Sequence, residues 1–322
     1  MALDSASTPA SRAAARSRRA KRFSVGVVVL VTLVVLVTFA LIPPIITGPM
    51  IAGPIAFQRT YAGEDVGLTP ERITLHTADD LALVAYAVHV EEPRAVVVFL
   101  SGTHAPSVTA FFGHAAMLAE AGYASLLIEM RARGESGGER IGLGYDEVLD
   151  LQAGVAHLQA QPAYAGVPIV AFGLSLGGAT AINATGMTPA IAGLVSLSAF
   201  SSWSDVFVDN MGLPEPLAGL QRAFVGLYLG FTYGFDRRDL VPRRQIERLG
   251  DRPALLVHSR DDSQVPFASF ERLVAAAPDH VETWVRDGDA HLVVSDGSFL
   301  RPWEDAEYAG VVMGFFERHF GP

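Results

Sequence analysis

Residues 168–185 read PIVAFGLSLGGATAINAT and contain the most informative motif in the chain. The run PIVAFG has the length and composition of a buried strand, and LGGATAINAT has those of a helix. Between them lies GLSLG (173–177), with glycine two residues before and two residues after Ser175. A sharp strand-to-helix turn crowds these two positions, so glycine there indicates a turn that holds Ser175 exposed. The competing interpretation is an ordinary tight turn between a strand and a helix.

The position of Ser175 suits nucleophilic chemistry. A serine hydroxyl is a weak nucleophile until a base removes its proton, so it must be held at a fixed angle beside that base. The first N–H groups of the following helix, with the positive end of its dipole, lie where a reacting carbonyl oxygen would become negative. The pentapeptide alone is a weak indication, because this chain contains 31 glycines. The strand before it and the helix after it supply the context that the motif requires.

The rest of the chain predicts an α/β fold with a mostly parallel sheet flanked by helices. Apolar strand-like runs occupy residues 95–100, 124–129, 168–173, 191–198, 253–258 and 281–286. Helical patterns lie between or after them, at about 111–119, 145–159 and 304–319. This alternation indicates strand–helix–strand units and a sheet covered on both faces. Two earlier segments, 72–77 and 81–90, predict an antiparallel hairpin where the sheet begins.

These ordered motifs resemble the α/β-hydrolase superfamily, in its serine-hydrolase branch with small lids. That branch includes monoacylglycerol-lipase-like and serine-aminopeptidase-like enzymes. The resemblance covers the chain from about Thr69 to the C-terminus, and EMRARGESGG (129–138) resembles a loop that supports the site in the family. It implies an α/β-hydrolase fold in which Ser175 is the nucleophile and an acid, then a histidine, follow it along the chain.

The acid that the resemblance implies is Asp262. The family carries it four residues after a histidine that ends a strand and four residues before a proline, and both counts, from His258 and from Pro266, meet at Asp262. The neighbouring Asp261 fits better as a loop residue that forms a turn. His258 itself resembles a structural histidine of the family.

The histidine that the resemblance implies is His291. The family places it on the loop after the next strand, commonly as Gly-x-x-His, and GDAH (288–291) has this form. His291 would take the proton of Ser175 and later give it to the leaving group, while Asp262 fixes its tautomer. The other eight histidines are more typical of surface or packing positions.

The resemblance also implies an oxyanion hole built from two backbone N–H groups. We expect Leu176, directly after the nucleophile, to supply one of them. The second belongs to the loop after the first parallel strand, where the family often has His-Gly. Here Ser101 replaces that histidine while Gly102 remains, and Thr103 is the expected donor. His104 could line the mouth of the site or could be an exposed loop residue.

A separate apolar segment precedes all of this. Residues 23–42, FSVGVVVLVTLVVLVTFALI, contain no charge, and twenty residues in a helix span about 30 Å, the thickness of the hydrocarbon layer. The sequence predicts one transmembrane helix that Pro43 and Pro44 end. The alternative is a cleavable signal peptide, but its apolar region is usually shorter, and TFA (38–40) is a poor match to a cleavage site.

Charge predicts how this helix is oriented. Residues 1–22 carry six basic side chains and only Asp4 as an acid; the basic residues are Arg12, Arg16, Arg18, Arg19, Lys21 and Arg22. By the positive-inside rule this tail lies in the cytoplasm, and the large domain lies on the extracytoplasmic side. The whole chain has a formal net charge of −10, and the chain after the tail has −15. Such an acidic body argues against a nucleic-acid partner.

The predicted organisation is a linker over residues 43–68 and a hydrolase domain over 69–322, with a lid at about 199–252. The lid is rich in apolar residues, which indicates a hydrophobic acyl substrate, although the same residues could simply pack the lid onto the sheet. The chain has no cysteine, and it lacks the signature motifs of metal and nucleotide sites, so we expect no cofactor and no metal.

The sequence therefore predicts a membrane-anchored serine hydrolase that cleaves carboxylic esters through an acyl-enzyme. A peptidase or amidase with the same triad is the first alternative. Recognition of a free N-terminus would need a carboxylate near the pocket mouth, and Asp205, Asp209 or Glu215 could provide it. A non-catalytic binding protein on the same fold is the second alternative.

Overall fold

The apolar runs form an eight-stranded sheet in the computed structural model, which describes residues 9–294 and 299–322. Its strands are β1 (Glu71–His76), β2 (Ala82–Val88), β3 (Val96–Leu100), β4 (Ala124–Ile128), β5 (Ile169–Leu174), β6 (Ile191–Leu197), β7 (Ala254–Ser259) and β8 (Glu282–Arg286). Their order in the sheet is β1-β2-β4-β3-β5-β6-β7-β8. β2 runs antiparallel to β1 and to β4, and the other neighbours are parallel. The predicted hairpin and parallel sheet are confirmed.

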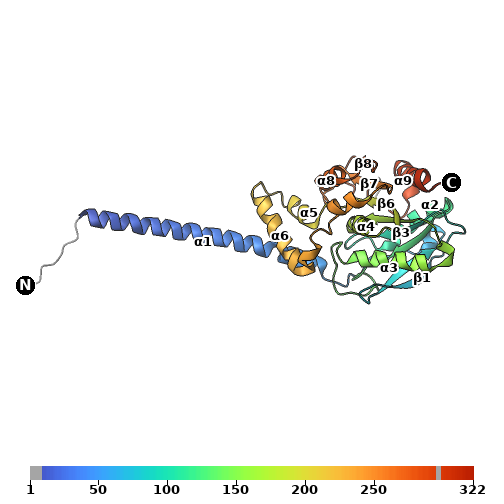
Figure 1. The fold of residues 1–322 in the computed structure, drawn as a ribbon, viewed down its shortest axis with the longest axis horizontal. Coiled ribbons are helices and arrows are strands. Elements are labelled where there is room, and N and C mark those ends of the chain that lie inside the picture. The colour runs from blue at the N-terminus through green and yellow to red at the C-terminus, as the bar shows by residue number, and fades with distance from the viewer. Residues whose placement is uncertain (1–8, 295–298) are drawn as a thin grey trace, which may run out of the picture.

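Helices cover both faces of this sheet, because central parallel strands are apolar on both sides. In β3, Val97 and Phe99 belong to one core cluster, and Val96, Val98 and Leu100 belong to the other. The first cluster lies under α2 (Phe112–Glu120) and α9 (Ala306–Phe320). The second lies under α3 (Glu147–Ala160), α4 (Leu176–Met187) and α8 (Ala268–Ala276). The helices thus sandwich the sheet, as Figure 1 shows.

A helical insertion lies between β6 and β7, at the position predicted for a lid. It contains α5 (Trp203–Asp209), α6 (Leu217–Tyr233) and the short α7 (Pro242–Gln245). Two 3-10 turns, η4 (Phe235–Arg237) and η5 (Ile246–Arg248), complete it. α6 packs beside the long N-terminal helix α1 (Pro9–Ile51), which projects away from the sheet (Figure 1).

The prediction that Pro43 and Pro44 end the N-terminal helix is wrong, because α1 continues through both residues to Ile51. A proline has no N–H, so Pro43 leaves the carbonyl of Phe39 without its usual helical donor. The buried side chain of Gln221, on α6, donates a hydrogen bond to this carbonyl at 3.3 Å. A contact from a distant part of the chain therefore supports a helix that local sequence would terminate.

Part of the segment expected to be a linker packs against the body of the protein. Pro43, Thr47 and Ile51 are buried at a spacing of four residues, so one face of the last turns of α1 packs into the body of the protein. The chain then pairs with the loop after β4, where the N–H of Ile55 donates to the carbonyl of Ala132 at 2.8 Å. The body of the protein thus begins before residue 69.

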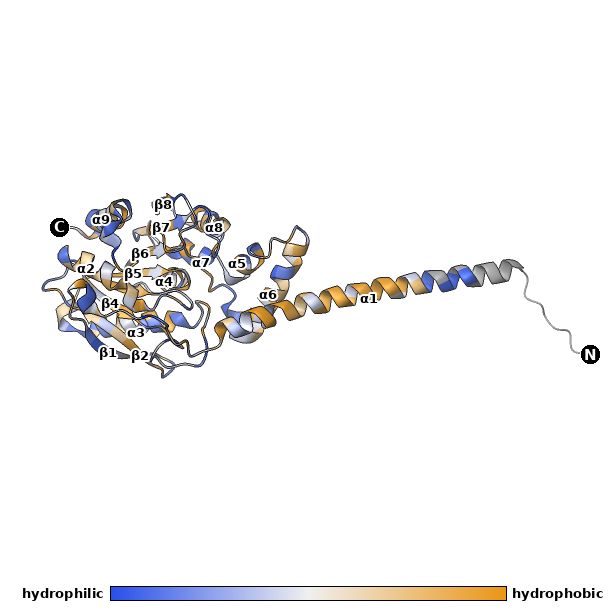
Figure 2. Ribbon diagram, turned by 180° about the vertical axis from the view of Figure 1, so that it is seen from behind, coloured by the Kyte–Doolittle hydropathy of each residue, from blue (hydrophilic) through white to orange (hydrophobic). Residues whose placement is uncertain are grey.

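α1 contains one stretch, Lys21–Ile51, that is long and apolar enough to cross a membrane, a test that a signal sequence would also pass. Every side chain from Lys21 to Thr38 is exposed. Figure 2 shows this apolar section projecting from the body, with a hydrophilic section on its N-terminal side.

Candidate active site

Ser175 sits on a strained turn between β5 and α4. Its backbone has φ 56° and ψ −118°, a conformation that non-glycine residues rarely adopt. A Cβ added at Gly173 would lie 2.1 Å from the carbonyl oxygen of Gly177. One added at Gly177 would lie 2.3 Å from the carbonyl oxygen of Leu100. Only glycine fits either position, so the two glycines are what allow the sharp turn.

Asp262 and His291 form a hydrogen-bonded pair. His291 Nδ1 lies 2.7 Å from Asp262 Oδ2, and the other carboxylate oxygen accepts from the N–H groups of Gln264 and Val265 at 2.9 and 3.0 Å. Asp262 is buried, whereas Asp261 is exposed. The structure thus brings Asp262, not its neighbour, to the histidine.

The environment of Asp262 keeps its carboxyl group ionised. Burial raises its pKa, but the hydrogen bond and charge of His291, with the two backbone amides, outweigh burial and bring the pKa below the usual value. An ionised Asp262 accepts a hydrogen bond from Nδ1–H of His291, and this tautomer leaves Nε2 unprotonated and free to act as a base.

Ser175 and His291 line one cavity of about 510 Å³, together with Thr103 and His104. His104 thus lines the site, which was one of the two positions expected for it. Within residues 9–294 and 299–322, no hydrogen bond joins the Ser175 hydroxyl to His291. Catalytic hydrogen bonds are often long in ligand-free sites and tighten when the substrate binds.

The expected oxyanion donors lie beside Ser175. Leu176 is the first residue of α4, so its N–H has no acceptor within the helix. The loop that carries Thr103 passes close by, since a Cβ added at Gly102 would lie 3.7 Å from Ser175 Cβ. Ser101, which replaces the family's histidine, is fully buried.

Arg133 holds this loop in place. Its side chain is fully buried, and its Nε donates to the carbonyl oxygen of Thr103 at 3.1 Å. The same guanidinium donates to the carbonyl of Arg131 at 2.9 Å and lies 3.6 Å from the carboxylate of Glu147. The sequence marked the loop 129–138 only as a supporting element, and the contact shows which of its residues reaches the site.

Two serines position the loop that carries His291. Ser198 donates to the carbonyl of His291 at 2.7 Å, and Ser259 donates to that of Ala290 at 2.6 Å. No motif in the sequence marked either serine. His258 is buried, and its Nε2 lies 2.9 Å from the carbonyl oxygen of Val265, beside the acid. Burial lowers the pKa of His258, so it is a neutral packing residue at the end of β7.

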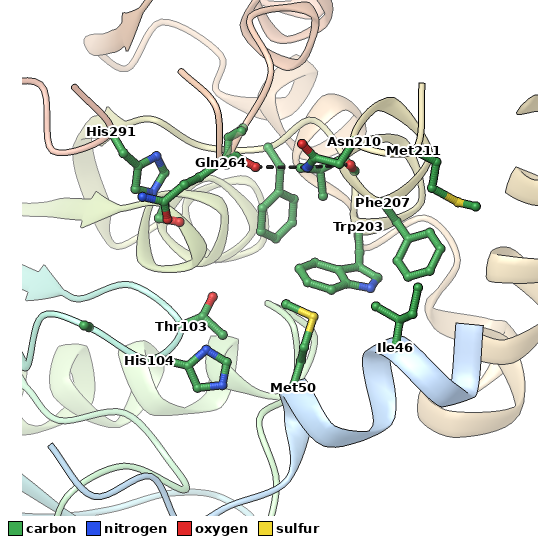
Figure 3. Close-up of a pocket in the computed structure, with 15 residues that line it drawn as sticks. Ile46, Met50, Thr103, His104, Trp203, Phe207, Asn210, Met211, Gln264 and His291 are labelled. Atoms are coloured by element: carbon green, nitrogen blue, oxygen red, sulfur yellow. Dashed lines mark hydrogen bonds between the residues drawn. The ribbon is translucent and has the colours of Figure 1, made fainter. Parts of the chain in front are cut away.

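Beyond Ser175 and His291 the cavity is mostly apolar. Its wall in the insertion comes from Phe200, Trp203, Val206, Phe207 and Met211. Figure 3 shows that the facing wall comes from Ile46 and Met50 of α1. Asn210, also in the lining, donates to the carbonyl of Gln264 at 3.0 Å and so ties the insertion to the loop of Asp262.

None of the three carboxylates that could bind a free N-terminus lines this cavity. Arg222 pairs with Asp209 at 3.2 Å and with Glu215 at 3.0 Å, and Asp205 is buried against Ser201 and Ser202. Among the described residues that line the cavity, none is acidic. Nor do the described residues gather three or more side chains that could hold a metal ion.

Comparison with known proteins agrees with this fold. Residues 91–230 match the family described as serine aminopeptidase, S33. An esterase of Pyrococcus furiosus has 22% sequence identity and a TM-score of 0.63, with 84% of this chain and 100% of that chain covered. An esterase domain from a Rhodothermus marinus protein has 20% identity and a TM-score of 0.55, with 79% and 100% covered.

A peptidase is similar as well. The acylaminoacyl peptidase of Pyrococcus horikoshii has 18% identity and a TM-score of 0.56, with 78% of this chain and 41% of that chain covered. The chain matches no curated protein sequence. The sheet order, the turn at Ser175 and the match over residues 91–230 together show that the chain has the α/β-hydrolase fold.

Proposed function

We propose that this protein is a membrane-anchored serine hydrolase that cleaves carboxylic esters of hydrophobic acyl groups. One observation carries the proposal: Ser175 on its strained turn and His291, which is hydrogen-bonded to the buried Asp262, line the same apolar cavity. This arrangement provides a nucleophile, a base and an acyl pocket together.

The reaction has two steps. His291 Nε2 takes the proton of Ser175 while Oγ attacks the ester carbonyl carbon, and the N–H groups of Leu176 and Thr103 bind the resulting oxyanion. The C–O bond to the alcohol then breaks, and His291 gives its proton to the departing oxygen. Water repeats the sequence on the acyl-enzyme, which releases the carboxylic acid and restores Ser175.

The lining of the cavity favours esters over peptides with a free N-terminus. An ammonium group needs a carboxylate partner. The described residues that line the cavity are apolar apart from Thr103, His104, Asn210, Gln264, Ser175 and His291, and none of these is a carboxylate. Peptidase or amidase activity remains the second candidate, because the matching family is described as serine aminopeptidase.

We further propose that α1 is an uncleaved anchor with its N-terminus in the cytoplasm. The charge before the apolar run supports this orientation. The contact between Gln221 and Phe39 supports retention, because cleavage after Ala40 would remove the acceptor of a buried side chain.

The test uses the full chain purified in detergent, with a fluorophosphonate probe and with matched p-nitrophenyl esters and aminoacyl p-nitroanilides. We expect Ser175→Ala and His291→Ala to lose labelling and to lower ester turnover by roughly 10⁴-fold or more. Anilide hydrolysis at a rate equal to ester hydrolysis would favour the peptidase. Folded wild-type protein that neither labels nor turns over would indicate a binding protein.

A further inference from the structure

The membrane helix forms part of the cavity that contains Ser175. Ile46 and Met50 lie one turn apart on α1, and both point into the cavity toward Trp203 and Phe207 (Figure 3). The cavity therefore runs from the catalytic serine to the surface of the helix that we propose as the anchor.

The depth of this wall follows from helix geometry. The apolar run ends at Ile42, so Ile46 lies about 6 Å and Met50 about 12 Å farther along the axis. The headgroup layer of a bilayer is roughly 5–8 Å thick on each side. Ile46 is therefore at headgroup depth. Since it is 45% exposed and also lines the cavity, it marks a mouth of the cavity that faces the lipid.

The insertion carries a second apolar surface beside this mouth. Its residues follow a helical spacing of four, three and four along α6: Leu220, Phe224, Leu227 and Phe231. The first two are half-buried, and Leu227 and Phe231 are 48% and 81% exposed. We call these four residues the outer stripe. The opposite side of α6, which includes Val225 and Leu229, is buried in the core.

α6 thus has apolar side chains on both sides, and Arg222 is its one charged residue. A helix that is apolar all round is buried in protein or in lipid. The contact between Gln221 and Phe39 fixes α6 against the last turn of the apolar run of α1. At that depth lipid surrounds α1, and the same lipid would also contact the outer stripe on the neighbouring helix. The bilayer is therefore the partner that this surface fits.

We propose that the protein takes its substrate directly from the bilayer, with the insertion resting on the membrane surface. The acyl chain of a membrane lipid passes between α1 and α5, beside Ile46, and its ester group reaches Ser175. α1 is then a wall of the acyl pocket as well as an anchor. This inference rests on the esterase function and the anchoring proposed above.

The first experiment uses a larger side chain on α1 to narrow the mouth of the cavity. In full-length protein in bilayer discs, Ile46→Trp is compared with Ile45→Trp. Ile45 is the neighbour of Ile46, but its side chain is 66% exposed and does not line the cavity. We expect Ile46→Trp to lower the ratio of kcat/KM for a dodecanoyl ester to kcat/KM for a butanoyl ester about tenfold or more. Ile45→Trp should leave both rates within about twofold of wild type. Equal effects of the two variants on the dodecanoyl ester would refute the role of α1.

The second experiment tests the outer stripe. Leu227→Asp/Phe231→Asp is compared with Trp303→Asp, which changes an exposed apolar residue just before α9. We expect the double variant to hydrolyse soluble butanoyl ester at the wild-type rate. It should lose about tenfold or more on a fluorescent acyl ester embedded in vesicles, because two charges in the interface oppose docking. Trp303→Asp should keep both activities.

The two substrates separate failure of this inference from failure of the proposed function. If wild-type protein does not hydrolyse the soluble ester, the esterase proposal fails. If it does, and the double variant keeps full activity on vesicles, the outer stripe does not bind lipid. A dimer in detergent that the double variant splits, with vesicle activity unchanged, would show that a second copy covers α6 and would overturn the proposal.

Discussion

Arg133 is a buried charged residue that supports the candidate active site without lining its cavity. Its Nε fixes the carbonyl of Thr103, and this orients the peptide groups of the loop that is expected to bind the oxyanion. The desolvation of a buried guanidinium is costly, and here the carboxylate of Glu147 and two carbonyls offset it. We therefore regard Arg133 as a positioning residue.

We predict that Arg133→Lys lowers kcat on a butanoyl ester about tenfold and leaves KM nearly unchanged, because lysine lacks the forked donors and the loop loosens in the transition state. Arg131→Lys is the matched control, since Arg131 is equally buried but pairs with Asp150 at 2.7 Å and with Asp79 at 2.8 Å. Steady-state kinetics of both variants decide the matter. Equal losses of kcat would indicate general loosening of the loop.

Glu129 gives a prediction for pH. Burial raises its pKa to about 7, against the smaller effects of Ser107 and Arg133. An unfolded glutamate has a pKa of about 4.3, so between these values the folded chain keeps a proton that the unfolded chain has released. The free energy of unfolding therefore falls as pH rises from about 4.3 to 7.

Glu129→Gln should remove this part of the pH dependence, because its side chain is neutral throughout. We expect the variant to gain about 2 kcal/mol relative to wild type between pH 5 and pH 8, visible as a smaller fall in melting temperature. Glu135→Gln, on the same loop but exposed, should leave the fall unchanged. A fall in Glu129→Gln as steep as in wild type would contradict the assignment.

The sequence was enough to propose the candidate catalytic residues but not the residues that hold them in place. The strand and helix around Ser175 and the resemblance to a known family were enough to propose Asp262 and His291, which the structure joins at 2.7 Å. Ser198 and Ser259 contact residues 93 and 31 positions away. A serine that supports a distant loop looks like any other serine until the chain is folded.

Among the elements, strands were predictable because short apolar runs bounded by turn residues have few other uses in a chain of this kind. The C-terminal end of α1 was not predictable, since a proline inside a helix usually breaks or kinks it. The donor that compensates for Pro43 is Gln221, and it lies on another helix. Local propensity failed at the place where a tertiary contact replaced a local one.

We predict that Gln221→Leu destabilises this junction, because the carbonyl of Phe39 then has no donor from α6. The expected cost is about 1–3 kcal/mol, or a melting temperature lower by roughly 2–5 °C. Gln245→Leu is the control, as Gln245 is also buried and its amide donates to the carbonyl of Asp239 at 2.9 Å, away from α1.

Hydrogen exchange separates the two variants. Amides of residues 40–48 should exchange faster in Gln221→Leu and at the wild-type rate in Gln245→Leu. Faster exchange in both variants, or in neither, would show that α1 does not depend on the contact with α6.

The proposed orientation of the whole protein in the membrane can be measured directly, because the chain has no cysteine and any introduced thiol is unique. We predict that a membrane-impermeant maleimide labels Asp279→Cys in intact cells, since residue 279 is exposed and belongs to the domain that we propose to lie outside the cytoplasm. Ser5→Cys, in the basic tail, should react only after the membrane is opened. The reverse pattern would place the domain in the cytoplasm.

Because α1 is the proposed anchor and also lines the cavity, the point at which the chain is cut matters when the protein is prepared for study. The usual soluble fragment of a single-pass protein is cut just after its apolar run, and a cut anywhere from Ile46 to Ile51 would remove part or all of the cavity wall that α1 provides. Such a fragment would keep Ser175, Asp262 and His291 but would leave one side of the cavity open to water. If the protein is the esterase that we propose, activity measured on such a fragment would overstate its preference for short, water-soluble esters.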